Sequence, residues 1–170
     1  MKLYVKEKTI ISDNLIKLLR AYTDLPVHKI PSIHHGQKYE AKARRCYAKE
    51  HLKACGCNVS VRDMGLYISL KYHFLGASVD GIITCSKCGV GTLEIKCPLE
   101  CASSKSFCAQ IDEKKKTLIL KMDHNYYYQV IGQLAVLELD WCDFVIWTRK
   151  GMAVQRILFN QPFWESQDDV

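Results

Sequence analysis

No stretch of this 170-residue sequence approaches the roughly 20 apolar residues that a membrane-spanning helix needs. The segment Met1–Lys8 also lacks the apolar core of a secretory signal peptide, so we expect an intracellular protein, in either the nucleus or the cytoplasm. Internal repeats, low-complexity tracts and domain linkers are absent from the sequence as well. Because 48% of the residues are hydrophobic, the chain can bury a core, and we expect one domain over residues 1–170.

Charge and cysteine content indicate which kind of partner and which state of the cysteines to expect. The net charge of +6 is a modest basic excess, which suits a polyanionic partner such as DNA without requiring one. Basic residues cluster within 38–49 and at Lys114–Lys116, either as ordinary solvated surface or as phosphate contacts. The nine cysteines are an odd number, and in a chain without a secretion signal they favour free thiols over a disulfide framework.

The most informative stretch runs from Asp80 to Lys96 and brings charge into an apolar context. Side chains alternate along a strand, so Glu94 and Lys96 share one face while Leu93 and Ile95 point into a core. Charge in such a strand costs free energy, which favours a functional site over a solvated surface pair. Carboxylate oxygens suit Mg²⁺ or Mn²⁺, and a lysine can orient or deprotonate an attacking water. The pattern therefore predicts metal-dependent cleavage of phosphodiesters.

Two segments in this region, Gly76–Gly81 and Glu94–Pro98, resemble the PD-(D/E)xK nuclease superfamily. More narrowly, they resemble the YqaJ-type viral recombinase group, which includes the phage lambda-type exonucleases. Gly36–Ala41 upstream and His124–Val130 downstream are similar to two further segments of that group, and the likeness spans about residues 33 to 150. It implies a restriction-endonuclease-like core, an α/β (α+β) fold with a mixed central sheet flanked by helices.

The resemblance also implies roles for further residues. Glu40 would help to hold a metal, and the alternative is an exposed helix glutamate paired with Arg44 four residues on. Asp80 and Glu94 would bind the ion, with the Ile95 carbonyl as a further ligand. Gln129 would orient Lys96 or the attacking water, since an amide both donates and accepts; the alternative is a surface amide. Whether one or two ions bind depends partly on Glu40.

Cys85 and Cys88 form the main rival signal, because two cysteines in a tight turn resemble half of a zinc site. Four ligands are normally needed, and the sequence has no second pair with this spacing. This favours a plain hairpin tip over a structural zinc. The cysteines that could complete such a site are Cys55, Cys57, Cys97, Cys101 and Cys108.

The expected elements are helices at residues 11–20, 36–55 and 125–139 and strands at 66–72, 76–84, 90–97, 144–148 and 153–159, with 101–121 unassigned. The resulting hypothesis is a Mg²⁺-dependent deoxyribonuclease, an exonuclease acting in DNA recombination or repair. The alternatives are an inactive nucleic-acid-binding module and a zinc-stabilised interaction domain. A homo-oligomer stays open, as does a single-strand annealing protein as partner, the latter from the resemblance alone.

Overall fold

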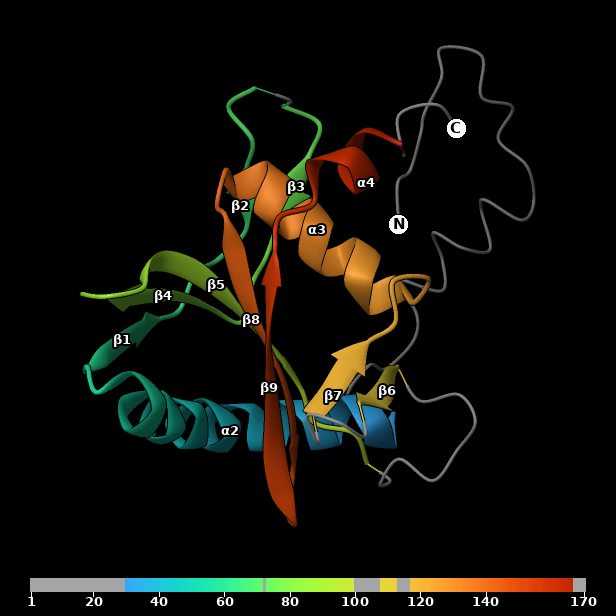
Figure 1. Cartoon of the computed structure of the whole chain (residues 1–170). Helices are drawn as coiled ribbons and strands as arrows, with labels where there is room; N and C mark the ends of the chain where they lie inside the picture. Colours follow the sequence, from blue (N-terminus) through green and yellow to red (C-terminus); the bar gives the residue numbers. More distant parts are fainter. Residues whose placement is uncertain (1–29, 72, 100–107, 113–116, 167–170) are drawn as a thin grey trace.

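A five-stranded mixed sheet forms the centre of the computed structural model, which describes residues 30–71, 73–99, 108–112 and 117–166 (Figure 1). Its strands lie in the order β1–β4–β5–β8–β9. β5 and β8 are parallel, and every other neighbouring pair is antiparallel. The strands are β1 (Val59–Arg62), β4 (Gly81–Cys85), β5 (Gly89–Lys96), β8 (Trp141–Thr148) and β9 (Gly151–Leu158). The predicted mixed sheet with flanking helices is confirmed.

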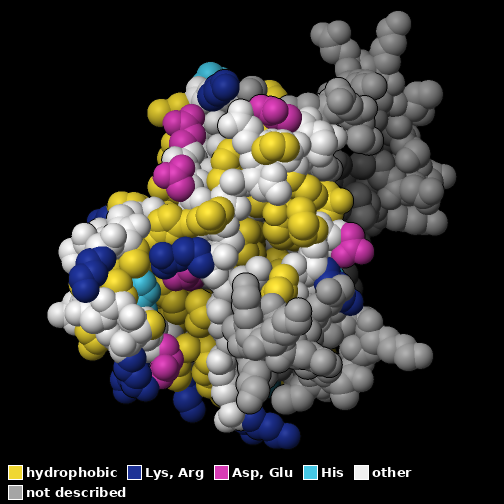
Figure 2. All heavy atoms as spheres, in the orientation of Figure 1, with side chains coloured by type: hydrophobic (Ala, Val, Ile, Leu, Met, Phe, Trp, Pro, Cys, Tyr) yellow, Lys and Arg dark blue, Asp and Glu magenta, His cyan; other side chains and the backbone are white. Residues whose placement is uncertain are grey.

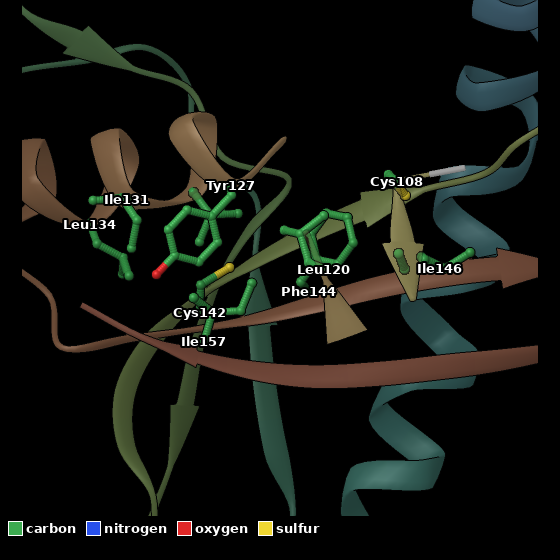
Figure 3. Close-up of a cluster of buried hydrophobic side chains, with 11 residues drawn as sticks. Cys108, Leu120, Tyr127, Ile131, Leu134, Cys142, Phe144, Ile146 and Ile157 are labelled. Atoms are coloured by element: carbon green, nitrogen blue, oxygen red, sulfur yellow. The ribbon is translucent and has the colours of Figure 1, made fainter. Parts of the chain in front are cut away.

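Two long helices, α2 (Pro31–Cys55) and α3 (Asn125–Leu137), pack on opposite faces of this sheet. The alternation of side chains along β8 separates the two cores. Phe144 points to the α3 side, where it joins the buried cluster shown in Figure 3. Its neighbour Val145 points to the α2 side, together with Ala43 and Tyr47 of that helix. Because it is buried on both faces, β8 does not alternate between apolar and polar residues, and Asp143 is its one charged side chain.

Smaller elements complete the described part of the chain. Two-stranded pairs form between β2 (Tyr67–Ile68) and β3 (Gly76–Ala77), and between β6 (Ala109–Asp112) and β7 (Thr117–Leu120). A short helix, α4 (Gln161–Glu165), follows β9 and packs against α3. Among the described residues, no helix is both long and apolar enough to cross a bilayer.

The structure departs from the sequence-based elements mainly at short or irregular segments. Helix α2 begins at Pro31 rather than near Gly36, because proline is well suited to the first helical position. It ends as predicted, with Gly56 in the left-handed conformation and its N–H bonded to the Leu52 carbonyl. The four-residue β1 was not predicted, and β6 and β7 lie in the unassigned segment 101–121. The helix expected at 11–20 and Lys114–Lys116 lie outside the described residues.

Gly91 provides a test of the packing between β5 and β8. A Cβ at this position would overlap the buried indole of Trp141 on the neighbouring strand. We expect Gly91→Ala to lower the free energy of unfolding by about 1–3 kcal/mol, as overpacking does in well-packed cores. Gly132→Ala is the matched control, because its Cβ meets only Trp164 at 3.9 Å inside a helix. The control should gain roughly 0.5–1 kcal/mol in denaturant unfolding; equal stabilities for the two variants would contradict this packing.

Candidate active site

The hairpin of β4 and β5 brings Asp80 and Glu94 to the same place. Gly81 pairs with Leu93, so Asp80, the residue before β4, lies opposite Glu94. Directly opposed residues of an antiparallel pair project to the same face. The backbone N–H of Ile95 donates to Asp80 Oδ2 at 2.6 Å, which fixes the Asp80 carboxylate against β5. The two carboxylates predicted to bind metal therefore meet at one end of the hairpin.

Glu94 is almost fully buried, with 3% of its surface exposed, and it is surrounded by donors. Lys96 Nζ lies 2.6 Å from Glu94 Oε1, and Gln129 Nε2 donates to the same oxygen at 2.8 Å. Gln133 Nε2 donates to Oε2 at 2.9 Å. A carboxylate oxygen can accept more than one such bond, so the charge is compensated despite its burial. The alternative, a solvated surface pair between Glu94 and Lys96, does not fit this geometry.

Lys96 is held by a second set of contacts. Its ammonium donates to Gln129 Oε1 at 3.1 Å and lies 4.4 Å from the centre of the Tyr126 ring, within cation–π range. Gln129 thus accepts from Lys96 through its oxygen and donates to Glu94 through its nitrogen. The structure brings together Asp80, Glu94, Lys96 and Gln129 as the sequence predicted, while their catalytic roles stay a prediction.

Gln133 is a further site residue, to which the sequence analysis assigned no role. It lies four residues after Gln129, on the same face of α3. Besides Glu94, its amide nitrogen binds the Ser78 carbonyl at 3.1 Å, and only 5% of its surface is exposed. A second glutamine at this spacing on a mostly apolar helix face was the available signal. It links α3 to both β5 and the segment before Asp80.

The carboxylates form a centre of negative charge. Burial and then the charge of Glu94 raise the pKa of Asp80 to about 6, and Glu40 contributes in the same direction. The Ile95 N–H and Lys96 act against this rise. Burial, followed by the charges of Glu40 and Asp80, raises the pKa of Cys97 to about 11. Because like charges converge here, a hard divalent cation with oxygen ligands fits the site.

Glu40 has two relationships in the structure. Its Oε1 accepts from Arg44 at 2.8 Å, so the helix pair considered as the alternative is formed. Arg44 also contacts Asp63. Glu40 is nevertheless close enough to influence the pKa of Asp80, which leaves its metal role open as a prediction. The role of the Ile95 carbonyl as a ligand is likewise a prediction.

The two turn cysteines lie at the other end of the same hairpin. Cys85 ends β4, and Cys88 precedes β5. Their sulfurs are close to Cys55, which the sequence named as a candidate, and to His51, which it did not. Cys101, another candidate, lies outside the described residues. The hairpin therefore carries carboxylates at one end and a cysteine–histidine cluster at the other.

The sheet, its flanking helices and the order of the acidic and basic residues define a nuclease core of the PD-(D/E)xK group. The chain belongs to the YqaJ-like viral recombinase domain family, whose model matches residues 4–140.

The comparisons also give individual relatives. Uncharacterized protein R354 of Acanthamoeba polyphaga mimivirus is 34% identical over 130 residues, which are 71% of this chain and 21% of that protein. The chain thus spans about a fifth of that relative's length. The crystal structure of the alkaline exonuclease LHK-Exo from Laribacter hongkongensis has a TM-score of 0.59 at 19% identity, covering 95% of this chain and 77% of that one. Its complex with dAMP gives 0.60 at 20% identity, with coverages of 96% and 77%. At this identity the likeness shows the fold.

The raised pKa of Asp80 predicts the pH dependence of Asp80→Asn without metal. A folded pKa above the unfolded one favours the protonated form, so this stabilisation is present below about pH 4 and is lost as pH rises through about 6. Asparagine stays neutral and can still accept from Ile95 N–H. At pH 8 we expect the variant to be more stable than the wild type by about 1–2 kcal/mol, after allowing for solvent screening.

At pH 4 the two proteins should unfold together, and thermal unfolding in EDTA at both pH values measures this. Added Mg²⁺ should raise the melting temperature of the wild type and leave Asp80→Asn unchanged. Strong destabilisation of the variant at pH 8 would instead make Asp80 a structural turn residue.

Proposed function

We propose that this chain hydrolyses DNA phosphodiester bonds with a divalent metal, Mg²⁺ or Mn²⁺, as a deoxyribonuclease. The observation that carries the proposal is the contact network of Asp80, Glu94 and Lys96, ordered by Gln129. Asp80 and Glu94 would hold the ion, with the Ile95 carbonyl and Glu40 as further ligands. The ion would supply Lewis acidity and neutralise charge on the scissile phosphate.

Lys96 would orient or activate the attacking water. Its ammonium carries three protons, and Glu94 and Gln129 take two of them as acceptors. The third is available to a water or a phosphate oxygen. Gln129 fixes the direction of the ammonium through its oxygen, so it acts as a positioning residue for Lys96. This division leaves metal binding to the carboxylates and water orientation to the lysine.

DNA is the proposed substrate, and α2 offers basic side chains for its phosphates. Four exposed residues of this helix, which we name the α2 basic stripe, share its outer side: Lys38, Lys42, Arg45 and Lys49. Figure 2 shows basic side chains along the lower part of the molecule, where Figure 1 places α2. The stripe points away from the sheet, and Lys38 and Lys42 lie within one turn of Glu40 but on the other side of the helix. We propose that Lys38 and Lys42 contact phosphates of DNA that extends from the site around α2.

Exonuclease action is the proposed mode, supported by the likeness to the fold of an alkaline exonuclease. A role in recombination or repair, with a single-strand annealing protein as partner, is proposed from the family. Incubation of the chain with linear and with covalently closed circular duplex DNA tests the mode directly. With Mg²⁺, the linear DNA should be degraded from its ends and the circular DNA should stay intact. Cutting of the circle would indicate an endonuclease, and binding without cleavage in Mg²⁺ or Mn²⁺ would indicate the inactive module.

Lys96→Ala separates chemistry from binding. Removing the ammonium should slow cleavage by about 10²–10⁴-fold, the usual contribution of a positioned acid–base group. DNA affinity should change little, because one phosphate-binding charge is a small part of an interface. Gln129→Ala should lower the rate less, since Lys96 keeps its bond to Glu94. Single-turnover cleavage and binding in Ca²⁺ measure the two effects, with Lys49→Ala as the surface control. Unchanged turnover in Lys96→Ala would remove this residue from the mechanism.

The position of the DNA is tested by two double variants on α2. One double variant, Lys38→Ala with Lys42→Ala, changes the part of α2 around Glu40. The other, Lys49→Ala with Lys53→Ala, lies about three turns further along the helix. The first pair should weaken DNA binding and reduce the slope of log affinity against log salt by about 1–2, because two phosphate contacts are lost. The second pair should have little effect. A larger effect of the second pair would place the DNA path elsewhere.

A further inference from the structure

We infer that the chain binds one structural zinc ion through His51, Cys55, Cys85 and Cys88. This second metal site joins the last turns of α2 to the turn between β4 and β5. His51 and Cys55 lie four residues apart and share a face of the helix. Cys85 and Cys88 come from the opposite side, at the hairpin tip. The site is independent of the proposed nuclease activity, because it lies at the far end of the hairpin from Asp80.

The distances agree with tetrahedral coordination. Cys55 Sγ lies 3.8 Å from Cys85 Sγ and 3.6 Å from Cys88 Sγ. Cys88 Sγ lies 4.0 Å from His51 Nε2, and all four ligand atoms fall within 4.8 Å of one another. Ligands around one zinc, with Zn–S about 2.3 Å and Zn–N about 2.0–2.1 Å, are separated by about 3.5–3.8 Å. A disulfide would need two sulfurs at about 2.05 Å and would leave the third thiol and the histidine unexplained.

A chain of buried hydrogen bonds orients His51 as a ligand. Tyr47 OH donates to Asp143 Oδ2 at 2.6 Å, so its oxygen is left to accept from His51 Nδ1, 3.2 Å away. This places the imidazole proton on Nδ1 and the free lone pair on Nε2, the atom that faces Cys88. Metal-binding histidines commonly have such a partner on their second nitrogen, which fixes ring and tautomer. The arrangement gives the buried Tyr47 and Asp143 a purpose that the nuclease site does not supply.

Two cations lie close to the cluster. Arg156 donates to both oxygens of Asp143, and it is close enough to Cys88 to interact with its charge. Lys87 Nζ donates to the Cys55 carbonyl at 3.1 Å. Zinc with three thiolates and a neutral histidine carries one negative charge, and Asp143 adds another. The two cations Arg156 and Lys87 balance them.

The ligand set indicates a structural rather than a catalytic zinc. Four protein ligands fill a tetrahedral zinc, which leaves no position for water or substrate. Cys85 and His51 are buried, at 3% and 7% exposure, so the site is closed on the protein side. Three thiolates also select zinc over the hard Mg²⁺ of the nuclease site. The zinc would therefore cross-link α2 to the β4–β5 hairpin.

Metal analysis of the full chain tests the proposal. Purified under reducing conditions and dialysed against metal-free buffer, the wild type should retain one zinc per chain by elemental mass spectrometry. Cobalt(II) exchanged into the site should show the visible absorption of a tetrahedral ion and a sulfur-to-metal charge-transfer band. Asp80→Asn should retain the zinc in full, which separates this site from the nuclease site. A chain that folds normally but binds no zinc, even when zinc chloride is added, would overturn the proposal. A disulfide between Cys55 and Cys88 would overturn it as well.

Ligand variants and matched controls complete the test. Cys88→Ser and His51→Asn should lose the zinc and melt at a lower temperature. Cys57→Ser and Cys46→Ser should keep the zinc and the melting temperature of the wild type. If the ligand variants do not fold, alkylation of the wild type gives the answer. Zinc should protect Cys55, Cys85 and Cys88, but not Cys57, from a thiol reagent until a strong chelator is added. Equal protection of all four cysteines, or none, would contradict the site.

Discussion

A buried carboxylate, that of Glu94, sets the requirements that the catalytic end of the molecule has to meet. Leaving it unpaired would cost several kcal/mol, so donors must be supplied from within the fold. Lys96 comes from the same strand, and Gln129 and Gln133 come from α3. These contacts need α3 to lie over β5. Strands β5 and β8 are parallel neighbours, and α3, which lies between them in the sequence, packs on one face of the sheet. The arrangement of β5, β8 and α3 therefore brings hydrogen-bond donors to the buried carboxylate of Glu94.

The β4–β5 hairpin and α2 meet twice along their lengths. At one end Glu40 approaches Asp80, and at the other His51 and Cys55 approach Cys85. Helix α2 has 25 residues and spans about 37 Å, so a small rotation about its C-terminal end would displace Glu40. A zinc at the cysteine end would restrict such rotations. This offers a physical reason for placing a rigid metal tie far from the carboxylates.

Much of the catalytic end could be predicted from the sequence because it depends on local rules. Alternation along one strand puts Glu94 and Lys96 on a common face, and the hairpin returns Asp80 to them. Gln129 required the family resemblance, since spacing alone cannot tell a positioning amide from a surface one. Gln133 was given no role and His51 was missed, because their partners Glu94 and Cys88 come from distant elements of the chain. For the same reason Cys85 and Cys88 looked like half a site, while the missing half was on α2.

The most direct measurement of the central claim is a crystal structure of the chain grown with Mn²⁺ at a concentration that supports DNA cleavage, with anomalous scattering recorded at the manganese edge. The account predicts an anomalous peak coordinated by carboxylate oxygens of Asp80 and Glu94 at about 2.0–2.2 Å, with Lys96 beside the metal-bound water. A peak elsewhere in an actively cleaving preparation, or carboxylates without metal under those conditions, would contradict the assignment of this active site.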